Sequence, residues 1–247
     1  MKRRILPSLV VAAVSAVAVS MSLTSCNNSS EDTASTTTYA MRQVDNTHDA
    51  IRRCNRQPGS GVLMSFDDFG TPEQVQAILD KLGEHRMRAA FFPTGKWAIE
   101  NYDLILRMRA EGHILGNHTH THANLEELSN NDESAFYGEI YPVEGMINTV
   151  PQLLRPPYEA GAYDARVGER LSERGVQICT WTADTKDWQG GDVNQMMQPL
   201  RDGDGHLPPL GPDGVILAHM HLPHTPALID AVVQYLNEQG WAYERTT

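Results

Sequence analysis

The chain has 247 residues, of which 40% are hydrophobic and 21% are charged, a composition typical of globular proteins that excludes collagen-like and wholly disordered chains. Its 20 lysines and arginines against 31 aspartates and glutamates give a net charge of -11, and no basic stripe marks a nucleic-acid surface. The length fits one α/β barrel better than two domains, since such barrels commonly run to roughly 200 to 250 residues.

The N-terminal residues have the pattern of an export signal. Positive charges in residues 1–4 precede an uncharged, largely apolar stretch that ends at Leu23. The residues up to Cys26 resemble the bacterial lipobox, which implies a signal peptide over 1–25 and lipid on Cys26. The protein is then expected to be secreted across the cytoplasmic membrane and lipid-anchored in the bacterial cell envelope. An ordinary signal peptide with an incidental cysteine is the alternative.

A polar segment follows the predicted lipid site. Residues 27–38 are almost all Asn, Ser, Thr, Glu and Asp, too polar to bury a face, so we expect a flexible tether over 26–45 and a catalytic domain over 46–247. The other two cysteines, Cys54 and Cys179, would lie in a compartment that permits disulfides, so a disulfide between them is one interpretation. The apolar residues around Cys179 favour the other interpretation, a small buried side chain in a strand.

Strands and helices alternate through this domain. A helix is expected after Thr71, because Thr71, Pro72 and Gln74 form a start signal with a capping box. The alternation implies a parallel sheet, most simply a barrel, in which the polar clusters after the strands converge at one rim. The predicted strands cover 62–66, 89–93, 114–116, 153–154, 176–183 and 215–218; further helices are expected at 99–109, 136–147 with a kink at Pro142, 164–174 capped by Asp164, 192–201 and 225–240.

Two of these polar clusters suggest a metal. Asp67 and Asp68 directly follow a strand, where adjacent carboxylates repel unless a cation offsets them; a pair of solvated turn residues is the alternative. His118 and His122 share a face if the chain turns helically, so one carboxylate and two imidazoles could hold one ion with positions left for water and substrate. His120 is then expected to be a bystander. If the segment is extended, all three histidines share a face, as in an amidohydrolase-like His-x-His site.

Three further clusters of residues complete a set of five motifs. Together with Ser65-Phe66-Asp67-Asp68 and His118-Thr119-x-x-His122, they resemble the five motifs of the polysaccharide deacetylase family, which includes chitin deacetylases and peptidoglycan N-acetylglucosamine deacetylases. The resemblance spans about residues 60–245 and implies a distorted (β/α) barrel with fewer than eight strands around a parallel sheet. The three clusters are Arg155-Pro156-Pro157-Tyr158, Asp187-Trp188 and Leu217-x-His219.

The resemblance implies a metal site with a base beside it. Asp68, His118 and His122 would hold a divalent metal, Zn²⁺ in the first place and Co²⁺, Ni²⁺ or Mn²⁺ as alternatives. Asp67 would be the general base, oriented and charge-balanced by Arg155.

The resemblance also implies the acid and the substrate contacts. His219 would be the general acid, and Asp187 would hold its imidazole and raise its pKa above about 6.5. The backbone N–H of Tyr158 would stabilise the oxyanion. Trp188 and Leu217 would wall a small pocket for the acetyl methyl group.

The chain departs from the family pattern at four positions. Phe69 stands where the family usually has glycine, and its bulk could narrow the cleft or shift the turn at Asp68. Glu159 replaces the glycine after Arg-Pro-Pro-Tyr, which affects the oxyanion-hole geometry and adds negative charge at the rim. His221 and His224 are extra to the last motif and are expected to be exposed loop residues; contacts that support the metal ligands, or a metal site in the loop, are the alternatives.

From the resemblance we predict a metal-dependent hydrolase that removes acetyl groups, first of all the N-acetyl of an N-acetylhexosamine, from a polysaccharide or oligosaccharide. Its partners would be an acetylated glycan and, through Cys26, a membrane; no nucleic acid is expected, and no protein partner can be deduced. One alternative is a C–N hydrolase of the same fold acting on a cyclic amide or ureide, against which the retained metal ligands argue. Another is a catalytically silent lipoprotein that binds sugar or metal, against which Asp67 and His219 argue.

Overall fold

The computed structural model describes residues 46–147 and 152–246. The predicted signal peptide, the lipid site at Cys26 and the tether over 26–45 therefore lie outside the described residues. Within the described ranges, every helix is too short or too polar to cross a membrane.

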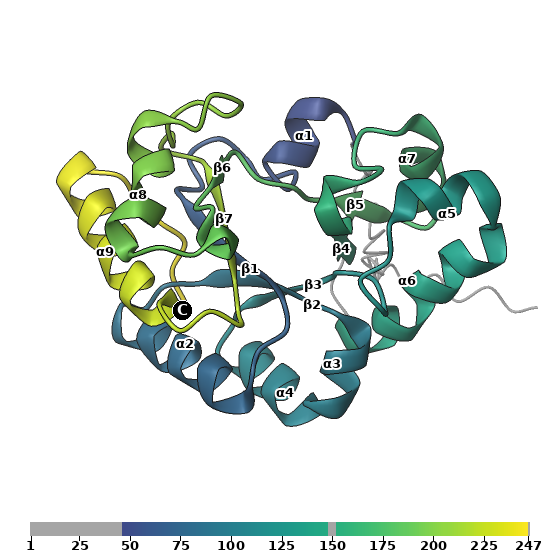
Figure 1. Ribbon diagram of the computed structural model, residues 1–247, viewed down its shortest axis with the longest axis horizontal. Coiled ribbons are helices and arrows are strands. Elements are labelled where there is room, and N and C mark those ends of the chain that lie inside the picture. Colours follow the sequence, from purple (N-terminus) through teal and green to yellow (C-terminus); the bar gives the residue numbers. More distant parts are fainter. Residues whose placement is uncertain (1–45, 148–151, 247) are drawn as a thin grey trace, which may run out of the picture. The chain divides into compact units, whose positions relative to one another are not determined.

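The domain is built on one parallel sheet, in which the strands run in the order β5-β4-β3-β2-β1-β7-β6 (Figure 1). Every neighbouring pair is parallel, which confirms the α/β class expected from the alternation of strands and helices. The strands are β1 (Leu63–Asp68), β2 (Ala89–Pro93), β3 (Ile114–Asn117), β4 (Gln152–Leu154), β5 (Val176–Ile178), β6 (Ala183–Asp184) and β7 (Val215–His219).

One segment, residues 176–184, forms both edges of this sheet. Its first part, β5, pairs with β4, and its last part, β6, pairs with β7. Only residues 179–182 separate β5 from β6, far fewer than a crossover between side-by-side parallel strands needs. The two strands therefore run on in one direction, and the sheet curls until its edges meet along a single segment, as the connection from β5 to β6 in Figure 1 illustrates. This confirms the distorted barrel with fewer than eight strands.

Helices cover the outer face of the curled sheet (Figure 1). Two of them begin at the predicted caps: Thr71 and Gln74 form the capping box of α2, and Asp164 accepts hydrogen bonds from two backbone N–H groups of α7. Asp192 caps α8, a cap that was not predicted. The helices are α1 (His48–Arg52), α2 (Pro72–Glu84), α3 (Gly95–Glu100), α4 (Tyr102–Ala110), α5 (Leu125–Asn131), α6 (Glu133–Ile147), α7 (Ala165–Ser172), α8 (Val193–Asp202) and α9 (Thr225–Gln239), with short 3₁₀ turns at Pro157–Glu159 and Asp187–Gln189.

The helix predicted over 99–109 is wrong in one respect, because the structure has two helices there. α3 starts earlier, at Gly95, and the chain leaves the helical conformation at Asn101 before α4 begins. The backbone N–H and the side chain of Asn101 both donate hydrogen bonds to the Trp97 carbonyl, so Asn101 closes the end of α3. Helices α1 and α5 were not predicted, since five and seven residues are too few to show a clear period.

Cys54 and Cys179 form a disulfide, although the sequence pattern favoured an unpaired cysteine at position 179. The pattern was right about burial, because Cys179 is fully buried. It could not indicate the partner, which lies 125 positions away in the chain.

Side chains along β1 and β2 alternate between two apolar layers. Met64 and Phe66 pack under the helices, whereas Leu63 belongs to a separate cluster with Phe92 of β2 inside the barrel. The period of two places Asp67 on the same inward face as Leu63 and Ser65. The strand thus delivers the Asp67 carboxylate to the interior of the barrel.

Candidate active site

The predicted site residues converge at the carboxyl end of the sheet. Asp67 and His219 are register partners at the ends of β1 and β7, and Arg155 directly follows β4. A cavity of about 310 Å³ opens at this rim. It is lined by Asp67, Asp68, His118, His122, Pro156, Tyr158, Glu159, Trp181, Asp184, Trp188, Leu217 and His219.

Asp68, His118 and His122 form a group with the geometry of a metal site. The Nε2 atoms of His118 and His122 lie 3.2 and 3.1 Å from Asp68 Oδ1, and ligand atoms of all three lie within 4.8 Å of one another. Ligands about 2.0 to 2.2 Å from a tetrahedral ion are roughly 3.3 to 3.6 Å apart, so a modest expansion fits a cation. Burial alone would raise the pKa of Asp68, but hydrogen bonds with the two histidines outweigh it and hold the pKa well below its ordinary value.

The two histidines meet through a tight turn rather than a helix or a strand. Thr119 and His122 both have positive φ angles, 63° and 67°. The Asn117 side chain accepts a hydrogen bond from the Thr119 N–H, and the Thr119 hydroxyl accepts one from the Ala123 N–H. The extended His-x-His alternative is therefore wrong. His120 is not part of the group formed by Asp68, His118 and His122, which we call the metal-competent group, and this is as expected of a bystander.

The remaining ring nitrogens of the ligand histidines are both occupied. His118 Nδ1 lies 2.8 Å from the Arg155 carbonyl oxygen, which can only accept, so Nδ1 carries the proton and Nε2 is free to bind an ion. His122 Nδ1 lies 2.9 Å from the Tyr158 hydroxyl. The Arg155–Tyr158 motif thus orients both imidazoles. The resemblance had assigned only a backbone N–H to Tyr158, so its hydroxyl is a contact that the sequence did not reveal.

Arg155 and Asp67 form a buried ion pair next to the metal-competent group. Arg155 Nη1 lies 2.6 Å from Asp67 Oδ1; Arg155 is completely buried and Asp67 is 3% exposed. The other oxygen, Oδ2, lies 3.8 Å from His118 Nε2. Burial lowers the pKa of Arg155, and the Asp67 carboxylate opposes this shift. The pair places one carboxylate oxygen next to the metal position and holds the other.

His219 is held by Asp187 on the opposite wall. Its Nδ1 lies 2.7 Å from Asp187 Oδ1, and its backbone N–H donates to Oδ2 at 2.8 Å. Nε2 lies 4.0 Å from Asp68 Oδ2, on the side of the metal group. Burial would lower the pKa of His219, but the hydrogen bond and charge of Asp187 dominate and raise it to about 9, in the predicted direction.

The cavity walls contain residues that were predicted and residues that were missed. Trp188, which is 55% exposed, and Leu217 both line the cavity. Trp181 and Asp184 line it as well; Trp181 lies within the predicted strand over 176–183 and Asp184 directly follows it, but neither was predicted as a site residue. Glu159 also reaches the cavity and has a positive φ of 59°, a conformation that glycine adopts more readily.

At the rim, Phe69 does not narrow the cavity and His221 is less exposed than expected. Phe69 is not among the residues that line the cavity; its ring is 51% exposed and stacks on His221 with centroids 5.5 Å apart. His221 is not an exposed loop residue, because it is partly buried and its Nδ1 lies 3.8 Å from Asp68 Oδ2. His224 is exposed, as expected. The aromatic contact explains the difference, since Phe69 covers the imidazole of His221.

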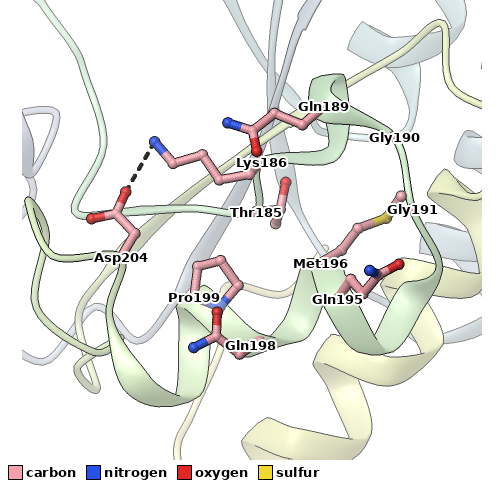
Figure 2. Close-up of a pocket in the computed structure, with 10 residues that line it drawn as sticks. All are labelled: Thr185, Lys186, Gln189, Gly190, Gly191, Gln195, Met196, Gln198, Pro199 and Asp204. Carbon is pink, nitrogen blue, oxygen red and sulfur yellow. Dashed lines mark ion pairs between the residues drawn. The ribbon is translucent and has the colours of Figure 1, made fainter.

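A second cavity of about 520 Å³ is lined by the 185–191 segment, by residues of α8 and by Asp204 (Figure 2). Asp184 and Trp188 of this segment line the first cavity, whereas Thr185, Lys186 and Gln189 line the second. At its edge Lys186 Nζ pairs with Asp204 at 2.9 Å, as Figure 2 shows. Its lining contains none of the predicted metal ligands or proton-transfer groups, so the 310 Å³ cavity is the candidate active site.

Comparison with known proteins gives consistent matches. The model of the family described as polysaccharide deacetylase matches residues 55–187. A peptidoglycan-N-acetylglucosamine deacetylase of Bacillus cereus is 31% identical over 187 residues, which cover 72% of this chain and 64% of that protein. A chitooligosaccharide deacetylase of Rhizobium leguminosarum bv. trifolii is 32% identical over 164 residues, covering 66% of this chain and 72% of the relative.

Solved structures agree with these matches. A peptidoglycan N-acetylglucosamine deacetylase, Bc1960, superposes with a TM-score of 0.64 at 26% identity, covering 77% of this chain and 92% of the other. A family 4 carbohydrate esterase from Streptomyces lividans, solved with acetate, gives a TM-score of 0.63 at 25% identity and covers 76% and 97%. The curled sheet is thus shared with solved carbohydrate esterases.

Proposed function

Because the chain belongs to the polysaccharide deacetylase family, we propose that it is a metal-dependent hydrolase that removes acetyl groups from a glycan, in the first place the N-acetyl group of an N-acetylhexosamine. One observation carries the proposal: the metal-competent group lies between a carboxylate held by Arg155 and an imidazole held by Asp187, all at one cavity. A silent binding protein has no need of two such supported proton-transfer groups.

The reaction would add water to the acetyl carbonyl carbon and break the C–N bond, releasing acetate and an amine. When bound by Asp68, His118 and His122, a divalent cation supplies Lewis-acid polarisation of the carbonyl and lowers the pKa of water. Asp67 would take a proton from the attacking water, and the ion pair with Arg155 orients its carboxylate.

The remaining groups would serve the second half of the reaction. His219, protonated at neutral pH, would deliver a proton from Nε2 to the leaving amine, while Asp187 holds Nδ1. The Tyr158 backbone N–H would stabilise the oxyanion. Trp188 and Leu217, both on the cavity wall, would contact the acetyl methyl group.

The ion, the substrate and the location are further parts of the proposal. Two imidazoles and one carboxylate suit Zn²⁺, with Co²⁺, Ni²⁺ and Mn²⁺ as alternatives. The names of the relatives suggest peptidoglycan or a chitooligosaccharide as substrate. The domain over 46–247 would work in the cell envelope, joined by the tether over 26–45 to a lipid on Cys26 after removal of residues 1–25.

The test is acetate release from a panel of acetylated glycans by zinc-reconstituted protein lacking residues 1–26. We expect about one equivalent of zinc and release of acetate, and His118→Ala should lose both. Release of ammonia or a ring-opened product from a cyclic amide or ureide, without acetate release, would favour the other C–N hydrolase. Glycan binding without any turnover would favour the silent protein. Equal zinc content in wild type and His118→Ala would refute the ligand assignment.

A further inference from the structure

The Cys54–Cys179 disulfide lies directly behind the arginine that holds Asp67. Arg155 Nη2 is 3.6 Å from Cys179 Sγ, and both cysteines are buried, with exposed fractions of 6% for Cys54 and 0% for Cys179. Neither cysteine lines the catalytic cavity. The covalent link therefore joins the segment after α1 to the place where the Arg155 guanidinium is held.

Three hydrogen bonds to oxygen atoms, in addition to the contact with Cys179 Sγ, position this guanidinium. Nε donates to the Cys179 carbonyl at 3.1 Å, Nη2 donates to the Thr180 carbonyl at 2.8 Å, and Nη1 donates to Asp67 Oδ1 at 2.6 Å. The group is planar and rigid, so two anchored nitrogens determine where the third points. The positions of the carbonyls at residues 179 and 180 consequently determine how Arg155 meets Asp67.

These carbonyls belong to the short connection that closes the barrel. Between β5 and β6, its backbone is held by single hydrogen bonds from Cys179 N–H to Leu154, from Thr180 N–H to Ile51 and from Thr182 N–H to Val215. Ile51 lies in α1, a helix of only five residues. So short a helix has little stability of its own, and the disulfide is the covalent tie between its C-terminal end and the connection.

We propose that the Cys54–Cys179 disulfide is a positioning element of the active site: it fixes the carbonyls of residues 179 and 180, which orient Arg155 and through it the Asp67 carboxylate. The inference rests on the proposed function, in which Asp67 accepts the proton of water. Loss of the link should lower kcat and leave the metal group intact, because the backbone carbonyl of Arg155, not its side chain, contacts His118.

The first test is Cys54→Ser, which breaks the link at the cysteine farther from Arg155. We expect kcat to fall roughly 10- to 100-fold, as for a small displacement of a reacting group, with KM and bound zinc unchanged. The matched control is Leu236→Ala in α9, a fully buried residue in the other apolar cluster, which should reduce thermal stability comparably. Assayed well below both melting temperatures, the control should keep its kcat. Equal kcat values for Cys54→Ser and wild type would overturn the proposal.

The second test is a double-mutant cycle with Arg155→Lys. If the disulfide acts through Arg155, adding Cys54→Ser to Arg155→Lys should lower kcat less than twofold further. Multiplicative effects would mean that the disulfide acts by another route and would also overturn the proposal. Failure of the proposed function is a different result, since wild-type protein would then release no acetate at all.

A third comparison avoids substitution altogether. Protein lacking residues 1–26, whose two cysteines are Cys54 and Cys179, is treated with a phosphine, which converts the disulfide and one water to two thiols and the phosphine oxide, until two thiols per chain are counted. Folded reduced protein, checked by circular dichroism, should reproduce the kcat loss of Cys54→Ser. Full kcat in the reduced state would contradict the proposal.

Discussion

Replacing Asp187 with asparagine should move the alkaline limb of activity toward neutral pH. Burial alone would lower the pKa of His219, and the hydrogen bond and charge of Asp187 are the main reason that it stands at about 9. Asparagine preserves the shape of the side chain but removes the charge. The pKa of His219 should then return to about 6.5 or lower, because its burial remains.

The magnitude depends strongly on pH. At pH 8 the protonated fraction of an imidazole falls from about 0.9 with a pKa of about 9 to about 0.03 with a pKa of about 6.5. Because only the protonated form can deliver a proton to the leaving amine, kcat/KM at pH 8 should fall about 30-fold. At pH 6 the loss should be less than about twofold, because the histidine is largely protonated in both proteins.

The assay is kcat/KM for acetate release between pH 5 and 10, with zinc content measured at each pH. Asp204→Asn is the matched control, since Asp204 pairs with Lys186 and lines the second cavity, away from His219. Its alkaline limb should match that of wild type. An unshifted alkaline limb in Asp187→Asn would refute the reasoning and assign Asp187 a purely structural role.

Three further changes test other parts of the site. Asp67→Asn should lower turnover roughly 10²- to 10⁴-fold while about one zinc stays bound, and near-normal turnover would remove Asp67 from the mechanism. Tyr158→Phe deletes only the hydroxyl at His122 Nδ1, so zinc affinity in chelator competition should fall about 10- to 100-fold; unchanged affinity would mean that the contact does not orient the ligand. Cys26→Ala should shift the protein from membranes to soluble or uncleaved forms in cell fractionation, whereas wild-type protein found wholly in the medium would contradict lipid anchoring.

The elements that could be predicted are those specified by neighbouring residues. The capping box at Thr71 and Gln74 and the cap at Asp164 each need only three or four residues, and both helices begin where these caps predict. The pairing of β5 with β4 and of β6 with β7 is not local. A single predicted strand over 176–183 did not reveal that its two ends pair with opposite edges of the sheet.

The residues of the active site also fall into those that could be predicted from the sequence and those that could not. Polar residues after parallel strands can be predicted to converge, because the carboxyl ends of such strands share one rim, and Asp68 and His219 do so. The Tyr158 hydroxyl and the carbonyl at Thr180 act through contacts between distant segments. Backbone carbonyls have no sequence signature at all, so the support of Arg155 becomes visible only in three dimensions.

The Asp187–His219 pair should also couple the stability of the metal-free protein to pH. A histidine whose pKa rises from about 6.5 in the unfolded chain to about 9 in the folded protein contributes about 3 kcal/mol, fully present below pH 6.5 and lost as the pH rises through 9. Asp187→Asn should remove most of this contribution. Asp187 Oδ2 also accepts a hydrogen bond from the His219 backbone N–H, and that part does not depend on the charge of the imidazole.

Urea unfolding at pH 6 and pH 10 separates the two parts. The difference in unfolding free energy between metal-free wild type and Asp187→Asn should be about 3 kcal/mol larger at pH 6 than at pH 10, because at pH 10 the imidazole is mostly neutral in both proteins. Asp67 and Asp68 act on His219 equally in both proteins, so their effects cancel in the comparison. A difference that is the same at both pH values would mean that Asp187 stabilises only the backbone of β7 and does not hold a charged His219.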